Sequence, residues 1–159
     1  MKKGHSPVVA IRHAALADSH AAAGLLHDFN TEFSFPTPGV ENLARRIRLL
    51  LEGEDVTILL AGQPPCGLAV MRLRPSIWTD ALDAYLEEFF VAKPNRGEGV
   101  GRALLEMTMT TARQAGARRM ELGTSETDVA ARRLYESCGF TDREGGPDGP
   151  MMLFYERDL

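Results

Sequence analysis

The sequence has few cysteines, a single tryptophan and no strong excess of charge, and each scarcity excludes a class of protein. Cys66 and Cys138 are the only two cysteines in 159 residues. They follow no spaced pattern, so neither a disulfide framework nor a zinc site is predicted. The 18 basic and 22 acidic residues leave a formal charge of −4, which offers no basic surface to nucleic acid or anionic membranes. We therefore expect neither nucleic acid nor a membrane as a partner. The unpatterned cysteines indicate a reducing compartment.

Long apolar runs are also missing. The first residues carry positive charge, but the apolar segment behind them ends by Arg12, which is too short for a signal peptide or a membrane span. A chain of 159 residues can bury a proper core as one domain. It contains no linker, repeat or low-complexity segment. We therefore expect a single cytoplasmic domain over residues 1–159.

The hydrophobic pattern alternates between strand-like and helix-like segments. The predicted order is β-α-α-β-β-β-α-β-α-β-β, which is typical of one mixed α/β domain. The second helix is expected to follow a Pro-rich break with Pro38 in its first turn, and residues 62–65 are expected to form a hairpin turn. Six of these seven strands are assigned to residues 8–11, 56–61, 66–72, 86–91, 120–123 and 151–156, and the predicted helical segments are residues 17–33, 38–52, 100–114 and 126–140.

A glycine-rich turn joins the strand that ends near Val91 to the helix that follows. Gly97, Gly99 and Gly101 keep side chains away, so backbone N–H groups at the helix start can surround a phosphate with help from the helix dipole. A P-loop is excluded, because it needs Lys and Ser or Thr where the chain has Arg102 and Ala103. The dinucleotide pattern G-x-G-x-x-G fails at its third glycine, which is also Arg102. The turn predicts a site for a pyrophosphate.

The segment Arg96-x-x-Gly99-x-Gly101 resembles the Arg/Gln-x-x-Gly-x-Gly/Ala signature of the GNAT superfamily of acetyl-CoA-dependent N-acetyltransferases. Residues 126–140, with Tyr135 on a helix that ends in Gly-Phe, resemble the second hallmark of that superfamily. The segment Tyr-Leu-Glu-Glu-Phe-Phe-Val at residues 85–91 is similar to the diamine (spermidine/spermine) branch. The resemblance implies a GNAT fold of the α/β (α+β) class: a mixed, mostly antiparallel sheet of six to seven strands with about four helices. It also implies acetyl-CoA as cosubstrate, no metal, and a homodimer as a possible assembly.

Transfer of an acetyl group to a primary amine needs a base, because such amines are mostly protonated at neutral pH. Glu87 and Glu88 are the nearest carboxylates, and strand alternation is expected to send them to opposite faces, so that at most one enters the acceptor site. The resemblance gives the role of base to Glu87, although a water relay through another group stays open. It gives Tyr135 the role of general acid for the departing thiolate. Because no cysteine lies beside a base near the motif, we expect direct transfer in a ternary complex.

The resemblance also implies which residues hold the two substrates. The backbone of residues 89–91 is expected to supply the oxyanion donor and to pair with the pantetheine arm. Glu98 lowers the positive potential of the turn unless its side chain points outward, and Asp128 is expected to cap its helix. The acetyl-CoA-binding residues are expected to be Phe89, Phe90, Val91, Arg96, Gly97, Glu98, Gly99, Val100, Gly101, Arg102 and Asp128. The expected acceptor-binding residues are Trp78, Glu88 and His27.

The preferred function is therefore N-acetylation of a primary amine, with a small cationic amine or polyamine as acceptor. Acidic residues near Trp78, namely Asp80 and Asp83, would favour a cation. An amino sugar, an amino-acid analogue or a protein amine is the alternative acceptor, and a non-catalytic acyl-CoA sensor is the alternative class. Plainer readings also stand: the turn as a simple connection, Glu87 in a salt bridge, and Tyr135 as a core aromatic residue.

Overall fold

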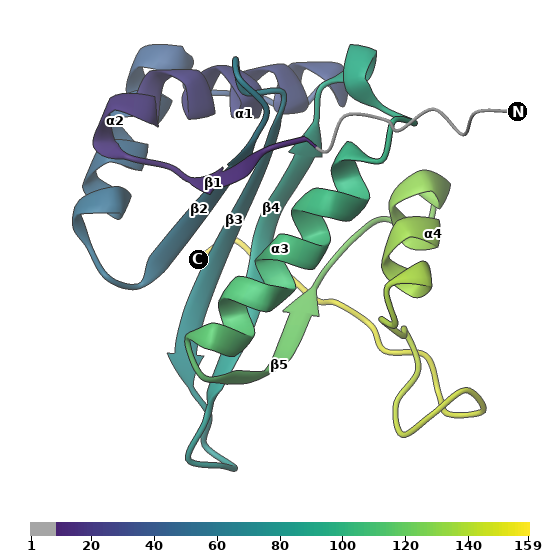
Figure 1. The fold of residues 1–159 in the computed structure, drawn as a ribbon. Helices are drawn as coiled ribbons and strands as arrows, with labels where there is room; N and C mark the ends of the chain where they lie inside the picture. Colours follow the sequence, from purple (N-terminus) through teal and green to yellow (C-terminus); the bar gives the residue numbers. More distant parts are fainter. Residues whose placement is uncertain (1–8) are drawn as a thin grey trace, which may run out of the picture. The chain divides into compact units, whose positions relative to one another are not determined.

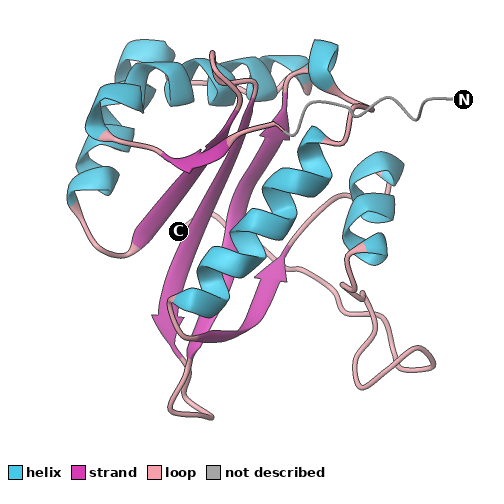
Figure 2. Cartoon of the chain, viewed as in Figure 1, coloured by secondary structure: helices cyan, strands magenta, loops and turns pink. Residues whose placement is uncertain are grey.

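The computed structural model describes residues 9–159. The chain divides into two compact units, Met1–Leu122 and Gly123–Leu159, and each is treated separately below. The first unit contains one sheet whose strands follow chain order (Figures 1 and 2). Neighbouring strands are antiparallel except the last pair, which is parallel. The expected mixed, mostly antiparallel sheet is confirmed. Its strands are β1 (Ile11–His13), β2 (Val56–Ala61), β3 (Gly67–Pro75), β4 (Leu82–Val91) and β5 (Ala117–Leu122).

Three helices of the first unit pack on the sheet. Helices α1 (Ser19–Glu32) and α2 (Val40–Glu52) bury Ala22, Leu25 and Ile47 against one face, where β2, β3 and β4 contribute apolar side chains such as Val70 and Phe90. Helix α3 (Val100–Gln114) lies in front of the sheet in Figure 1. Its Ala112 packs in a second cluster with Met71, Ala84 and Ala117. Because alternate strand residues point to opposite faces, the two clusters occupy the two sides of the sheet.

Several predicted elements are confirmed closely. Helix α3 has the predicted bounds, and β2 and β3 form the expected hairpin. Gly62 in the turn between them has φ +85°, a left-handed conformation that favours glycine. Strand β3 extends to Pro75 and β4 begins at Leu82. The loop between these two strands is therefore shorter than expected.

The starts of the first strand and the first two helices differ from the prediction. Strand β1 lies at Ile11–His13, and Val8 of the predicted strand falls outside the described residues. Helix α1 is preceded by a 3-10 turn, η1 (Leu16–Asp18). The placement of Pro38 in the first turn of the second helix is wrong, because α2 begins at Val40 after Gly39, whose φ is +86°. The Pro38 carbonyl instead accepts a hydrogen bond from the Asn42 side-chain amide at 2.8 Å.

The predicted tail strand at residues 151–156 is also wrong. In the second unit, Met151 forms only one isolated bridge with Arg143, and no strand follows it. The apolar side chains from Met152 to Tyr155 are exposed. An extended segment becomes a strand only when a neighbour pairs with it, and the alternating sequence alone did not supply that neighbour. The sheet of the described residues therefore has five strands rather than six to seven.

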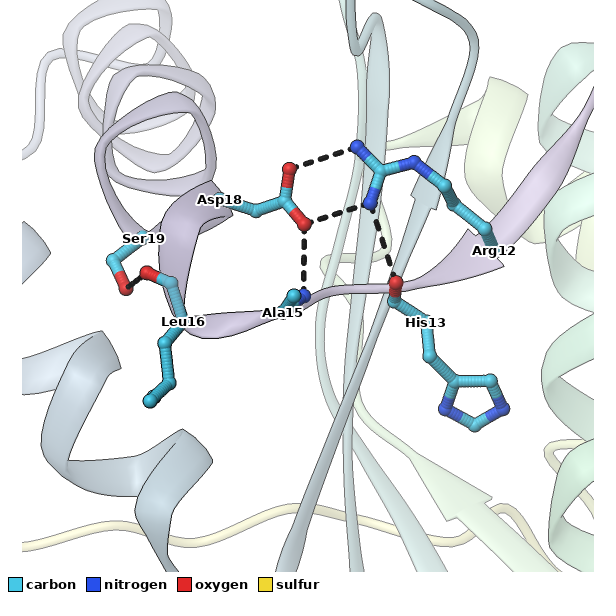
Figure 3. A network of polar contacts seen from close by, with 6 residues as sticks. All are labelled: Arg12, His13, Ala15, Leu16, Asp18 and Ser19. Carbon is cyan, nitrogen blue, oxygen red and sulfur yellow. Dashed lines mark hydrogen bonds and ion pairs between the residues drawn. The ribbon is translucent and has the colours of Figure 1, made fainter.

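A bidentate ion pair fixes the path of the chain from β1 into α1 (Figure 3). Arg12 donates from Nη1 and Nη2 to Asp18 at 2.7 and 2.8 Å, and the Asp18 carboxylate also accepts from the Ala15 N–H at 2.8 Å. The hydrogen bonds from Arg12 and Ala15 lower the pKa of Asp18 to about 2. Asp18 therefore stabilises the turn before α1 rather than capping the helix by its side chain.

We predict that Asp18→Asn lowers the free energy of unfolding at pH 7 by about 1 kcal/mol, a value reduced for the partial solvent exposure of the pair. Because the pKa of Asp18 is lower in the folded chain, its contribution is complete above the unfolded value of about 4. It is lost as the pH falls toward 2. Urea unfolding at pH 7 and pH 2.5 measures this, with exposed Asp55→Asn as control; equal destabilisation at both pH values would contradict it.

Candidate active site

The glycine turn has the backbone geometry of an anion-binding loop. It follows a 3-10 turn, η2 (Lys93–Asn95), and leads into α3. Gly97 and Gly99 have φ +78° and +85°, and a Cβ added at either would meet no atom within 4 Å. The two glycines are therefore required by conformation and leave open space, not tight packing, above the start of α3. Gly101 lies inside the helix, so only two of the three glycines need positive φ.

The backbone N–H groups of the first turn of a helix have no partner within their own helix, and they lie at the positive end of the helix dipole. Val100 is buried and anchors the turn, whereas Glu98 is exposed. Arg102 is the third residue of α3, with Nη1 3.7 Å from the Glu106 carboxylate. The residues present fit a phosphate group on geometric grounds: open space, aligned donors and the positive end of a helix dipole.

A β-bulge interrupts β4 at the acidic pair. Along β3, consecutive residues Val70 and Met71 pair with Glu88 and Leu86, so Glu87 is an extra residue on β4. One added residue in one strand is the defining feature of a bulge. Bulges re-aim side chains and are frequent beside active sites.

The bulge places both carboxylates on the same face of the sheet. Glu88 is opposite Val70, which belongs to the core under α1 and α2. Glu87 accepts a hydrogen bond at 2.7 Å from Nε of Arg72, which pairs with Val56 of that same core. Because paired residues share a face, both carboxylates lie on the α1/α2 side. The expectation that alternation sends Glu87 and Glu88 to opposite faces is wrong, because the extra residue breaks the two-residue period.

The two carboxylates have different surroundings. Glu87 is exposed and forms its ion pair with Arg72. Glu88 is half-buried, and its burial, with a smaller contribution from the negative charge of Glu87, raises its pKa. A half-buried carboxylate beside a salt-bridged carboxylate suits acid–base chemistry, because the two environments differ in how strongly they favour the charged form.

The end of β4 extends past its pairing with β5. The parallel register runs from Leu82–Ala117 to Leu86–Leu122, whereas β4 continues to Val91. Phe90 is buried under α1, where its ring centroid lies 5.3 Å from that of Phe29. The backbone of residues 89–91 thus lies between the acidic pair and the glycine turn, where the oxyanion donor is expected.

Arg96 contacts protein groups on three sides. Its Nη1 and Nη2 donate to the two carboxylate oxygens of Glu32 at 2.6 and 2.7 Å, and its Nε donates to the Val91 carbonyl at 2.8 Å. Its guanidinium carbon lies 5.5 Å from the centre of the Phe90 ring. The hydrogen bond from Arg96 lowers the pKa of Glu32. Arg96 therefore joins the start of the glycine turn to the last residue of α1.

The connection between α1 and α2, residues 33–39, is tied back to α1. His27 Nδ1 lies 3.2 Å from the Thr37 hydroxyl, and the Asn30 side-chain amide donates to the Pro36 carbonyl at 3.2 Å. His27 thus holds this connection in place. Phe35, at its centre, is 63% exposed and available to a ligand.

Trp78 lies in the turn between β3 and β4 and is 90% exposed. Six strand residues, from Leu82 to Glu87, separate that turn from Glu88, and an extended strand rises about 3.3 Å per residue. The structure therefore does not bring Trp78 together with the acidic pair within one copy of the first unit.

The second unit carries helix α4 (Val129–Ser137). Its expected cap is confirmed, because the Asp128 carboxylate accepts from the Ala131 N–H at 3.0 Å. Tyr135 is buried, with its ring 6.0 Å from that of Phe140. Burial, and to a lesser extent the charge of Asp128, raise the pKa of Tyr135 to about 12. Its phenol is therefore fully protonated at neutral pH and suited to donating a hydrogen bond.

Two residues of the site were missed by sequence reasoning. Arg72 was not singled out, because its contact with Glu87 depends on the hairpin register of β3 and β4. Glu32 contacts Arg96, which is 64 residues away in the sequence, so no local pattern predicts this ion pair. Among residues 9–159, no helix is both long and apolar enough to cross a membrane, and no cluster of three metal-binding side chains forms.

We predict that Glu88→Gln stabilises the fold at neutral pH. Because the pKa of Glu88 is raised in the folded chain, its ionised form opposes folding once the pH exceeds the unfolded value of about 4.3. The glutamine removes that charge with little change in shape. Thermal unfolding at pH 4 and pH 7.5 should show a higher midpoint than wild type only at pH 7.5. A lower midpoint at pH 7.5, relative to an exposed Glu106→Gln control, would contradict this.

Comparison with known proteins identifies relatives of this chain in sequence and in fold. Residues 22–140 match the model of the Acetyltransferase (GNAT) family. An aminoglycoside N(6')-acetyltransferase type 1 of Stenotrophomonas maltophilia is 28% identical over 141 residues, which is 84% of this chain and 87% of that protein. The crystal structure of a provisionally assigned acetyltransferase from Arthrobacter sp. FB24 is 45% identical, with a TM-score of 0.88 over 96% of this chain and 97% of that one.

An aminoglycoside acetyltransferase from an uncultured soil metagenomic sample shares the fold, with a TM-score of 0.74 and 16% identity over 95% of this chain and 97% of that one. The family match covers the end of β4, the glycine turn and the helix that carries Tyr135. The chain belongs to the GNAT family of acetyltransferases.

Proposed function

We propose that this protein transfers an acetyl group from acetyl-CoA to the primary amine of a small cationic acceptor. The observation that carries the proposal is the pair of carboxylates on one face of β4, nine to twelve residues before the positive-φ glycines at the start of α3. One strand thus leads from groups suited to an amine to groups suited to a pyrophosphate.

The acidic pair supplies the base in this proposal, with Glu87 as the group that takes the amine proton. Nε of Arg72 orients the Glu87 carboxylate through a hydrogen bond of 2.7 Å. Glu88, half-buried beside it, adds a second negative group that attracts the ammonium form of the acceptor. Once the amine nitrogen is neutral, it attacks the thioester carbonyl carbon, the carbon–sulfur bond breaks and the thiol leaves.

Two further groups complete the proposed mechanism. Backbone N–H groups in residues 89–91 stabilise the negative charge on the carbonyl oxygen. Tyr135, with a pKa of about 12, gives the leaving sulfur a hydrogen bond or a late proton. We propose the glycine turn and the first turn of α3, with Arg102, as the pyrophosphate site. The transfer is direct, without an acyl-enzyme.

The acceptor class rests on charge and on one relative. The acidic pair favours a cation, which suits a small amine or polyamine. The S. maltophilia relative, named for aminoglycoside acetylation and 28% identical over most of this chain, favours an amino sugar as the second candidate. An amino sugar carries several ammonium groups, so both candidates are consistent with the same two carboxylates.

We predict that Glu87→Gln lowers kcat about 100- to 10,000-fold, the usual contribution of a positioned base, with little change in the KM for acetyl-CoA. Tyr135→Phe should lower kcat by about tenfold, because a hydrogen bond to the leaving thiolate is lost. Thiol release from acetyl-CoA over a panel of polyamines, aminoglycosides, amino acids and peptides measures both. Exposed Glu41→Gln is the control. Unchanged turnover in Glu87→Gln would refute the role of Glu87, and CoA binding without turnover on any amine would favour a sensor.

We also predict that Gly99→Ala weakens CoA binding about tenfold or more. Its φ of +85° costs an alanine roughly 1–2 kcal/mol, and the methyl group enters the space assigned to the phosphates. Gly116→Ala is a matched control, since Gly116 has φ +98° at the other end of α3. Titration calorimetry with CoA should show normal affinity for Gly116→Ala. Equal losses in the two variants would indicate a general effect of strain and not a phosphate site.

A further inference from the structure

Arg96 is the arginine of the glycine-turn signature, and its contacts are with protein. Its two Nη atoms fit the Glu32 carboxylate in the fork geometry that gives arginine its strongest ion pairs. Its Nε donates to the last carbonyl of β4, at Val91. A phosphate that bound these nitrogens would first have to displace Glu32, so the contacts do not support the expectation that Arg96 is a phosphate ligand.

The Arg96 contacts join three segments that are distant in sequence. Glu32 is 64 residues from Arg96 and is the last residue of α1. The Phe90 ring below the guanidinium packs on Phe29 at 5.3 Å, and Phe29 packs edge-on against Phe33 at 5.2 Å. The ion pair, the β4 carbonyl and the aromatic stack therefore meet at one junction.

On one side of this junction is the glycine turn, which begins immediately after Arg96. On the other is the connection of residues 33–39, which begins immediately after Glu32 and is also held by His27 and Asn30. That connection lies on the α1/α2 side of the sheet, the side that carries Glu87 and Glu88. The Arg96–Glu32 ion pair therefore directly joins the residues that adjoin these two segments.

We propose that Arg96 is a positioning residue that couples the cofactor turn to the acceptor side through Glu32. The proposal rests on the proposed function in assigning these two sides to acetyl-CoA and amine. Breaking the ion pair loosens both segments together, so it affects CoA affinity and the KM for the amine in the same direction. The lowered pKa of Glu32 agrees with a carboxylate that stays ionised in this contact.

Removing the Glu32 carboxylate gives opposite results for the two roles of Arg96. If Arg96 bound phosphate, Glu32→Gln would release it and tighten CoA binding. If Arg96 is a positioning residue, Glu32→Gln and Arg96→Gln each weaken CoA binding by about fivefold. The double variant binds CoA no more weakly than either single variant, because both changes break the same interaction. Arg96→Lys should behave as Arg96→Gln, since lysine keeps the charge but loses the fork.

The experiment combines CoA titration calorimetry, the KM of acetyl-CoA and of the amine, and hydrogen exchange of the free protein. Exchange at residues 33–39 and 97–99 should rise by about fivefold in both single variants. Glu41→Gln, whose side chain is 85% exposed, should match wild type throughout. Tighter CoA binding in Glu32→Gln, additive losses in the double variant, or a lower melting temperature with unchanged affinity and KM would each overturn the proposal. Hydrogen exchange of the free protein tests the positioning role of Arg96 even if CoA does not bind. Failure to bind CoA would refute only the proposed function.

Discussion

The bulge in β4 is the constraint on which the site depends. One residue, Glu87, is added opposite the Val70–Met71 step of β3. Before it, Ala84 and Leu86 serve the core beneath α3; after it, Glu88 and Phe90 face α1 and α2. Even-numbered residues of β4 therefore face α3 before the bulge and face α1 and α2 after it. As a result, Glu87 and Glu88 lie on the same face of the sheet. A regular strand of the same sequence would separate the two carboxylates.

The rest of the first unit holds this point of β4 from several directions. Strand β3 fixes the register and supplies Arg72. The buried ring of Phe90 packs on Phe29 of α1, close to the contact of α1 with Arg96. The two glycines with positive φ then reverse the chain into α3, which returns along the other side of the same sheet. The segment from Glu87 to Gly99 therefore contributes to the core, to the acidic pair and to the glycine turn.

Local patterns were enough to predict the parts of this design that local chemistry determines. The glycine turn, helix α3, the β2–β3 hairpin and the Asp128 cap follow from residue types at fixed spacing. The bulge does not, because it exists only when two strands are compared in register. The ion pair of Glu32 with Arg96 spans 64 residues, and no periodicity reports such a contact. The prediction of a strand at residues 151–156 was wrong for the same reason, because alternation in the sequence does not show whether a neighbouring strand is there to pair with it.

Arg72 gives the site a resident counter-ion. Its guanidinium forms an ion pair with Glu87, so under the proposed function an entering ammonium group would replace a cation rather than meet a bare carboxylate. Such an exchange would release less free energy than filling a vacant anionic site, because the charge of Glu87 is already partly compensated by its partner. Charge alone then discriminates poorly among amines, and the shape of the surrounding walls decides which acceptor is retained.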